Sequence, residues 1–105
     1  MSREHRLIIR LKAEEDLSAA ALFYDLQRPG LGDEFLAEVH SAIAKALENP
    51  FQFVRLRRQP EVRRVLTQRF PYRIFFIRRV GYIIVFRVLH GARHDREWKQ
   101  NIPKD

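Results

Sequence analysis

The chain has 105 residues, 46% hydrophobic and 31% charged, which suits one compact domain with a modest core and leaves no room for a second. It contains no cysteine, which excludes disulfides, cysteine-ligated zinc and a thiol nucleophile. Charged residues interrupt the first twenty positions, which excludes a signal peptide, and no 18-residue apolar run exists for a membrane span. We therefore expect a cytoplasmic protein that spans no membrane.

Charge is divided unevenly between the two halves of the chain. Residues 1–50 carry six Lys or Arg and nine Asp or Glu, a net charge of −3, whereas residues 51–105 carry fourteen and four, a net charge of +10. Sixteen of the twenty cations are arginine, whose planar guanidinium binds phosphate and carboxylate in bidentate fashion. This pattern favours an anionic partner, a nucleic acid or an acidic protein segment, over a basic surface kept only for solubility.

The first half predicts one strand followed by two helices. Apolar residues between arginines in residues 6–11 predict a short strand near a sheet edge. Early acids and helical apolar spacing predict a helix over 13–27, and Pro and Gly predict a turn over 28–32. A second helix, ended by Asn49-Pro50, would pack against the first as an αα-hairpin. Its apolar stripe comprises Phe35, Val39, Ala42, Ile43, Ala46 and Leu47.

The second half predicts a loop and three strands. Residues 51–61 are expected to form the loop, followed by strands over 62–69, 72–79 and 82–89. The last two strands are close enough for Val80-Gly81 to join them as a hairpin. The element order is β-α-α-β-β-β. It predicts a single α+β domain over the whole chain, with the αα-hairpin packed on a mainly antiparallel sheet.

Both faces of the predicted sheet are apolar. Alternation along the strand at 72–79 places Arg73, Phe75, Ile77 and Arg79 on one face and Tyr72, Ile74 and Phe76 on the other. We expect the helices to cover one face and the C-terminal segment, with a helical turn or two in residues 95–101, to cover part of the other. We also expect one continuous core with the second helix, formed by Ile74, Phe76, Ile84 and Phe86.

Candidate chemistry is limited to a cluster of basic residues. The chain has no Gly-rich phosphate loop, His-Glu-x-x-His motif or nucleophile elbow. No further ligand lies near His90 and His94 in the sequence, so we expect neither a metal nor another cofactor. Cleavage of RNA through its 2′-hydroxyl needs a base, an acid and cations, which arginine and histidine supply. The cluster comprises Arg63, Arg64, Arg73, His90, Arg93 and His94.

Structural roles compete with the functional ones for several of these side chains. Arg64 and Arg73 would instead form structural ion pairs with acids of the first half of the chain, such as Glu14 or Asp16. For Arg64 the two interpretations stay balanced, and for Arg73 and Arg93 a functional role is favoured. A strand-end His90 more often makes a structural hydrogen bond than a catalytic contact.

Aromatic residues and further arginines complete the candidate surface. Tyr72 and Trp98 would stack on a base if exposed, but packing onto the core is the expected role of both. The predicted loop places its arginines beside Phe51 and Phe53. The residues assigned to nucleic-acid or target binding are Arg55, Arg57, Arg58, Arg63, Arg64 and Trp98.

Several short motifs are spread over nearly the whole chain, and their order resembles that of one family. They are the Gly30-Leu31-Gly32 turn, the Asn49-Pro50 helix end, Val62-Arg63-Arg64, Arg-Phe-Pro-Tyr-Arg at 69–73 and His-Gly-x-Arg-x-Asp-x-x-Trp at 90–98. Together with the element order they resemble toxins of the bacterial RelE/ParE toxin–antitoxin superfamily. The resemblance implies a small toxin silenced by a cognate antitoxin encoded beside it. RelE-like members cut messenger RNA on the ribosome, and ParE-like members poison DNA gyrase.

The resemblance assigns roles residue by residue. The catalytic arginines of RelE-like toxins match Arg73 and Arg93. Where those enzymes have a catalytic tyrosine, this chain has Trp98 and Lys99, and their loop lysines correspond here to arginines, which carry protons poorly. A histidine, His90 or His94, would then have to act as the base.

The motifs lie closer to the ParE-like branch, which predicts a type II toxin that inhibits DNA gyrase. A ribosome-dependent messenger RNA endoribonuclease is the alternative, and a non-toxic basic RNA-binding module is a further one. The resemblance implies a cognate acidic antitoxin as partner, in a hetero-oligomer with this chain, and gyrase or the ribosome with its messenger RNA as target.

Overall fold

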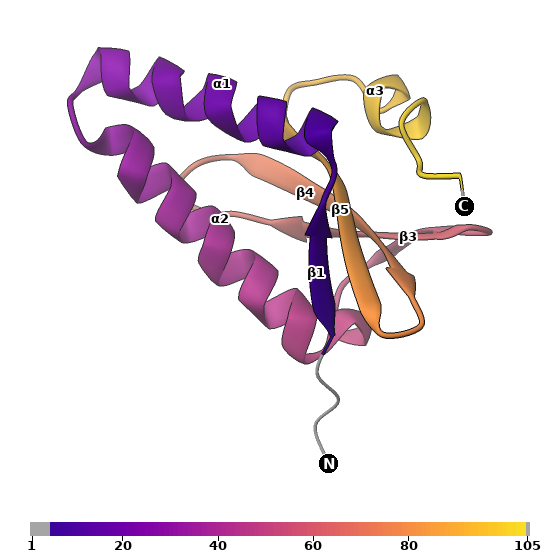
Figure 1. Ribbon diagram of the computed structural model, residues 1–105. Helices are drawn as coiled ribbons and strands as arrows, with labels where there is room; N and C mark the ends of the chain where they lie inside the picture. The colour runs from indigo at the N-terminus through magenta and orange to yellow at the C-terminus, as the bar shows by residue number, and fades with distance from the viewer. Residues whose placement is uncertain (1–4, 105) are drawn as a thin grey trace.

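The helices and strands predicted from the apolar pattern are present in the structure, which has one more strand than predicted. The structure is a computed structural model that describes residues 5–104. The elements in chain order are β1 (Arg6–Ile9), α1 (Leu11–Gln27), α2 (Leu31–Glu48), the 3-10 helix η1 (Pro50–Gln52), β2 (Arg55–Arg58), β3 (Glu61–Leu66), β4 (Tyr72–Arg79), β5 (Tyr82–His90) and α3 (Arg96–Lys99). Figure 1 shows the helical hairpin of α1 and α2 beside the sheet, with α3 near the C-terminus.

The five strands form one sheet in the order β1-β5-β4-β3-β2. β1 runs parallel to β5, with Arg6 opposite Tyr82, and the other neighbours are antiparallel. The predicted α+β architecture and the edge position of the first strand are confirmed. The segment expected to be a loop instead contains η1 and the second edge strand, β2. That strand was missed because it holds a single apolar residue, Leu56, among arginines.

Two glycines shape the turn of the helical hairpin. Gly30 has φ 90°, a left-handed conformation that side chains disfavour, and ends the connection between α1 and α2. At Gly32 the helices approach so closely that a Cβ would lie 2.4 Å from the carbonyl oxygen of Ala21. The Gly32 N–H donates to Asp25 Oδ1 at 2.8 Å. The Gly-Leu-Gly motif therefore serves both the turn and the close contact.

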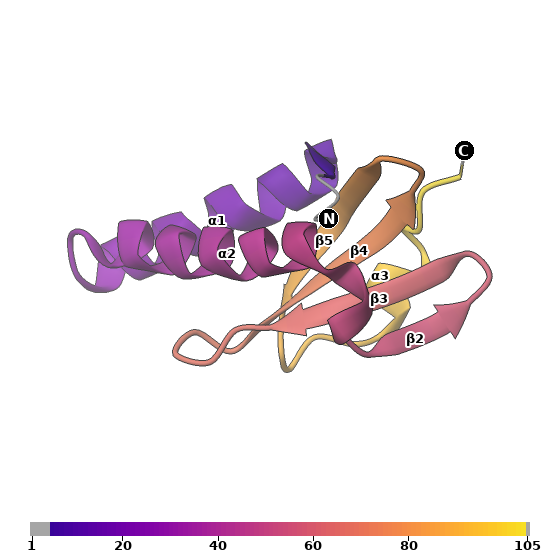
Figure 2. The same cartoon turned by 90° about the horizontal axis from the view of Figure 1, so that it is seen from below.

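The larger core lies between the helical hairpin and one face of the sheet (Figure 2). The apolar stripe of α2 is buried there as predicted, except for Leu47, which is partly buried. From the sheet, Tyr72, Ile74, Phe76, Val85 and Val88 contribute to the same core. Within the described residues, neither helix is long and apolar enough to cross a membrane.

A second core lies on the opposite face of the sheet, and it corrects the prediction of one continuous core. Its buried residues are Val62, Phe75, Ile77, Ile84, Phe86, Leu89 and Trp98, with Ile102 packed against them. The two-residue hairpin turn fixes the register and pairs Ile77 with Ile84, so Ile84 shares the face of Ile77 rather than that of Phe76. Phe86 follows on the same side. The C-terminal segment covers this face, as expected.

Candidate functional site

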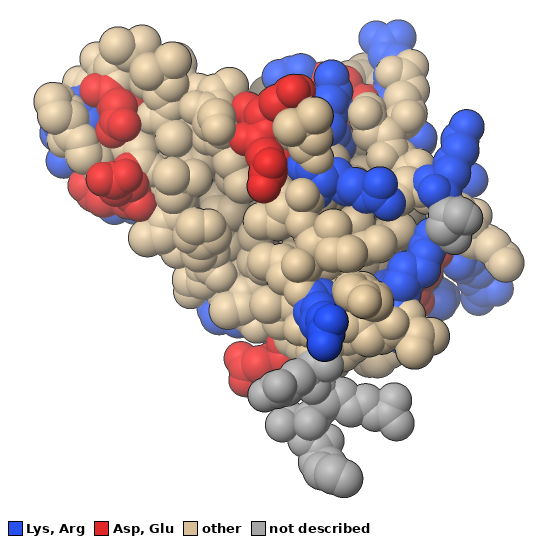
Figure 3. All heavy atoms as spheres, viewed as in Figure 1, with Lys and Arg blue, Asp and Glu red and all other residues tan. Residues whose placement is uncertain are grey.

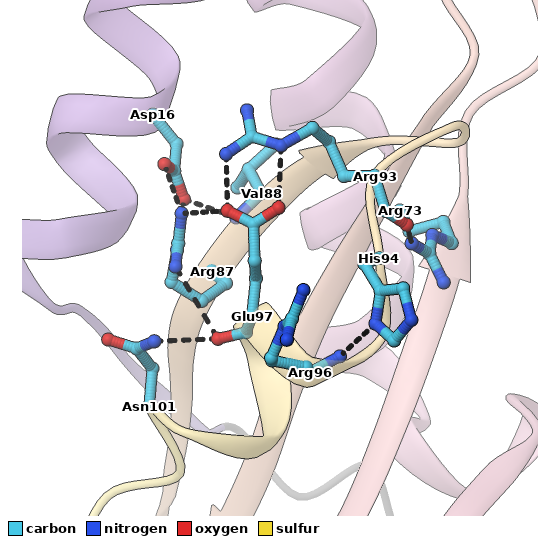
Figure 4. A network of polar contacts seen from close by, with 9 residues as sticks. All are labelled: Asp16, Arg73, Arg87, Val88, Arg93, His94, Arg96, Glu97 and Asn101. Atoms are coloured by element: carbon cyan, nitrogen blue, oxygen red, sulfur yellow. Dashed lines mark hydrogen bonds and ion pairs between the residues drawn. The ribbon is translucent and has the colours of Figure 1, made fainter.

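The candidate site lies at the end of the sheet where β4 begins and β5 ends. Arg73 stands at the start of β4 and His90 ends β5, and Tyr72 lies directly opposite His90. Arg93 and His94 follow in the segment that leads to α3, and Figure 4 shows this segment lying over β4 and β5. The fold therefore gathers the candidate residues from two strands and one connecting segment.

At its centre is Arg87, a buried arginine that the sequence pattern did not single out. Arg87 is 5% exposed. Its Nε donates to Asp16 Oδ2 at 2.7 Å and its Nη2 to Asp16 Oδ1 at 2.9 Å, a bidentate pair between β5 and α1. The same carboxylate accepts the Val88 N–H at 2.9 Å. Because β1 stops at Ile9, opposite Val85, Asp16 occupies the open edge of β5 beyond the last strand pair.

Glu97 of α3 joins this pair to Arg93. Arg93 donates its Nε to Glu97 Oε2 at 2.6 Å and its Nη2 to Glu97 Oε1, and that oxygen also lies 4.0 Å from Arg87 Nη2. The hydrogen-bonded guanidinium of Arg93 lowers the pKa of Glu97, and Glu97 raises the pKa of Arg93 in return. Both groups are therefore held in their charged forms.

Arg73 is bound by the same connecting segment. Its Nη1 donates to Asp95 Oδ1 at 2.7 Å and its Nη2 to the carbonyl oxygen of Arg93 at 2.6 Å. The guanidinium lies 5.2 Å from the centre of the Phe75 ring, within cation–π range. The hydrogen bond from Arg73 lowers the pKa of Asp95. Arg73 thus ties the segment after β5 to the sheet.

The acids of the first helix do not pair with the arginines that we expected. Asp16 binds Arg87 instead of Arg73 or Arg64, because the first turns of α1 lie beside β5. Within residues 5–104, no carboxylate lies at ion-pair distance from Arg64, and its buried Nε has no hydrogen-bond partner. The alternative in which Arg64 and Arg73 pair with Glu14 or Asp16 is therefore not what the structure shows.

Tyr72, His90 and Arg93 meet at a hollow of about 210 Å³ beside α1. The ring of His90 lies edge-on to Tyr72, with 5.4 Å between ring centres. His90 Nδ1 accepts the Ala92 N–H at 3.0 Å, which leaves Nε2 to carry the proton of the neutral ring. Burial, with a smaller effect of Tyr24, raises the pKa of Tyr72 to about 12. The phenol therefore stays protonated at neutral pH.

The remaining candidates lie apart from this hollow. Arg73 and His94 do not line it. His94 Nδ1 accepts the Arg96 N–H at 3.1 Å at the start of α3. No group of three metal-ligating side chains occurs among the described residues.

The arginines assigned to a target surface lie on β2 and β3. Arg55, Arg57 and Arg58 are exposed on the edge strand β2. Arg63 on β3 is more constrained, because its Nη1 donates to the Phe53 carbonyl at 2.6 Å and its Nη2 to Glu61 at 3.1 Å. Arg55 Nη1 lies 3.9 Å from the same Glu61 carboxylate.

Trp98 is part of the second core. It is 4% exposed and stacks on Phe75, with ring centres 5.3 Å apart and planes 18° apart. This burial agrees with its expected packing role. It also corrects the assignment of Trp98 to the target surface, since a buried indole offers no face to a base.

The site fixes its cations firmly and offers little for proton transfer. Arg73 and Arg93 each bind a carboxylate, and the phenol of Tyr72 is buried with a raised pKa. The two histidines of the site, His90 and His94, are both exposed. The geometry therefore suits a rigid binding surface better than general acid–base catalysis.

Comparison with known proteins agrees with the fold. The family model described as "ParE toxin of type II toxin-antitoxin system, parDE" matches residues 7–95. No curated protein matches the chain. Among solved structures, a chain of the "Chromosomal ParDE TA system from P. aeruginosa" has 21% sequence identity and a TM-score of 0.73, covering 85% of this chain and 98% of that chain. The family match runs from β1 to the connecting segment before α3. The chain belongs to the ParE toxin family of type II toxin–antitoxin systems.

Proposed function

We propose that this protein arrests growth by binding and inhibiting DNA gyrase. The observation that carries the proposal is the engagement of both candidate catalytic arginines. Arg73 lies 2.7 Å from Asp95 Oδ1, and Arg93 Nε lies 2.6 Å from Glu97 Oε2. RNA cleavage needs a free acid and base beside the scissile phosphate, whereas an inhibitor that acts by binding needs only a complementary surface.

The distribution of charge supports a binding mode of action. Figure 3 shows Lys and Arg side chains gathered where the C-terminal segment and the β2–β3 turn lie, with acidic side chains at the tip of the helical hairpin and near the start of α1. A one-sided basic surface speeds association with an acidic partner or with DNA held by a partner. Gyrase bound to its DNA substrate offers such a target.

The proposal is tested with purified protein and two target assays run in parallel. We expect the protein to inhibit DNA supercoiling by gyrase, or to increase the amount of cleaved DNA that gyrase holds. We expect translating ribosomes to show no new cuts in messenger RNA. Arg73→Ala should affect gyrase inhibition only as far as it affects folding, which circular dichroism and a thermal melt measure on the same sample.

Ribosome-dependent cleavage of messenger RNA is the second candidate, and the hollow at Tyr72, His90 and Arg93 favours it. This site offers an imidazole and a cation at one point. Codon-positioned cuts that disappear in a folded His90→Ala variant, with gyrase unaffected, would replace the gyrase proposal with this one.

We further propose that a cognate antitoxin covers the exposed side of α1. The chain's own helices and C-terminal segment cover the two apolar faces of the sheet, so an antitoxin would need another apolar surface. The large apolar side chains left exposed on α1 are Leu11, Leu22, Phe23 and Leu26. An amphipathic antitoxin segment would bury them in an interface on the order of 2,000 Å².

A further inference from the structure

A basic cleft separates the β2–β3 turn from the C-terminal segment. Its volume is about 610 Å³. Four cations line it from three parts of the chain, and two amides accompany them: Arg57, Arg79, Lys99 and Lys104, with Gln59 and Gln100. None of the described residues that line the cleft is acidic. The cleft lies on the face of the sheet away from the helical hairpin and does not include the hollow at Tyr72.

Three of these cations are not neutralised by the part of the chain that the structure describes. Within residues 5–104, no carboxylate lies at ion-pair distance from Arg57, Lys99 or Lys104. Arg57 uses its Nε on the Gln59 carbonyl at 3.2 Å, and Lys99 lies 5.7 Å from the centre of the Trp98 ring. Their charges contrast with those of Arg73, Arg87 and Arg93 at the candidate site, each of which has a carboxylate partner. The cleft therefore holds three cations that no carboxylate of residues 5–104 neutralises.

The walls of the cleft suit a phosphodiester chain better than a protein segment. A protein partner would need large apolar side chains to pack on, as at the centres of protein interfaces. The apolar residues that line the cleft are Pro60, Ile102 and Pro103, and none of the large apolar side chains that stay exposed, such as those on α1, is among them. A nucleic-acid backbone instead needs Lys and Arg for its charge and amide donors for its phosphate oxygens.

We infer that this cleft binds the phosphodiester backbone of a nucleic acid, without reading its bases. The exposed Arg55 and Arg58 on β2 continue the basic surface beyond the cleft. This binding does not depend on the proposed action on gyrase and needs no second protein. It would place the toxin directly on the DNA or RNA that accompanies its target.

The test measures the binding of two fluorescently labelled nucleic acids by anisotropy over a range of salt concentrations. One is a duplex DNA, and the other is a single-stranded RNA with the sequence of one of the two DNA strands. The key variant combines Arg57→Gln, Lys99→Gln and Lys104→Gln. The control combines Arg6→Gln, Lys12→Gln and Lys45→Gln, exposed cations of the first half that remove the same net charge. Circular dichroism checks that all three proteins are folded.

We expect the cleft variant to bind about tenfold or more weakly than the unmodified chain, and the slope of log K against log salt for duplex DNA to fall by about 2 to 3. The control should lose no more than about threefold in affinity. Binding of DNA, RNA or both supports the inference and identifies the source of the backbone. Because Lys104 lies outside any helix or strand, Lys104→Glu alone provides a second variant that should weaken binding without unfolding the protein.

Three results would overturn the inference. The first is no measurable binding of either nucleic acid. The second is an equal loss of affinity in the control, which would show only a general effect of net charge. The third is competition by poly-L-glutamate as effective as that by unlabelled DNA at equal charge, which would assign the cleft to an acidic protein segment. None of these assays contains gyrase, so their failure and that of the proposed function are separable.

Discussion

At the scale of single residues, the Asp16 carboxylate connects several groups by hydrogen bonds. It accepts two hydrogen bonds from Arg87 and one from the Val88 backbone, and so joins α1 to the last strand. The side chains of Arg87 and Asp16 are 6% and 15% exposed, so neither charge is well solvated when its partner is missing. Loss of one member should therefore be much worse than loss of both.

We predict that Asp16→Ala lowers the free energy of unfolding by about 3 kcal/mol, because it leaves Arg87 charged and unpaired in a buried position. The double variant Asp16→Ala with Arg87→Met should recover part of this loss, since no lone charge remains. Urea denaturation measures the free energy of unfolding of each variant. Glu15→Ala, at an exposed position of the same helix, should change the value by no more than about 0.5 kcal/mol. A double variant less stable than Asp16→Ala would contradict this account.

The ion pairs of the connecting segment should make the stability of the folded protein sensitive to acid. The pKa values of Asp95 and Glu97 are lowered from their ordinary values of 3.8 and 4.5 by Arg73 and Arg93. A lowered folded-state pKa contributes stability that is fully present above the ordinary value and is lost as pH falls through the folded value.

We therefore predict a melting temperature that is nearly constant from pH 7 to about 5 and decreases below it. Glu97→Gln should lower the melting temperature at pH 7 and flatten this decrease. Glu48→Gln, at the exposed end of α2, serves as the matched control. An acid dependence that Glu97→Gln leaves unchanged would show that other carboxylates cause it.

At the scale of elements, the sheet is packed on both faces, and each face has its own core. Phe76 contributes to the core under the helices and is 1% exposed, while Phe86 contributes to the core under the C-terminal segment. We predict that Phe76→Ala lowers the free energy of unfolding by about 3 to 5 kcal/mol, and that Phe86→Ala lowers it by a similar amount. Val80→Ala, at a position 92% exposed, should be nearly neutral. A midpoint of chemical denaturation that Phe76→Ala barely moves would contradict this packing.

The sequence predicted the elements well where apolar periodicity decides them, as in the stripe of α2. It missed β2 because an exposed edge strand needs no apolar alternation, and the run around Leu56 is mostly arginine. The face of Ile84 was predictable from the two-residue hairpin turn, which sets the register with Ile77.

The candidate site was only partly predictable for a different reason. Arg73 and Arg93 were identified through motifs, but their carboxylate partners were not. Arg87 is one charged residue in an apolar strand, and its partner Asp16 lies 71 positions away along the chain. A single sequence has no period or spacing that reports such a distant pair. Only the fold, by laying α1 along the edge of β5, brings the two together.

At the scale of the whole molecule, a basic second half is attached to a mildly acidic helical hairpin. The apolar exposed side of α1 and the basic cleft are made by different parts of the chain. An antitoxin on α1 and an anionic target at the basic surface would therefore recognise different chemistry. Neutralisation would then depend on the apolar side chains of α1 rather than on the arginines of β2.

We predict that expression of this chain alone arrests growth and that co-expression with the acidic protein encoded beside it restores growth. Leu22→Glu with Phe23→Glu should keep its toxicity and resist this rescue, because it places charge on the proposed antitoxin surface. Ser18→Glu, also exposed on α1, is the control and should still be rescued. Growth curves after induction measure each case. Normal growth with abundant folded protein would count against a toxin.

The parallel pairing of β1 with β5 also constrains when the fold can be completed. Arg6 lies opposite Tyr82, so this edge of the sheet can form only after β5 has been synthesised. The hydrogen bonds of Asp16 likewise form only after Arg87 and Val88 have been added to the chain. Such distant contacts fold slowly and late. A chain that has been synthesised only as far as β4 therefore lacks both the β1–β5 pairing and the Asp16–Arg87 ion pair, so two of the contacts that hold β1 and α1 against the sheet cannot yet exist.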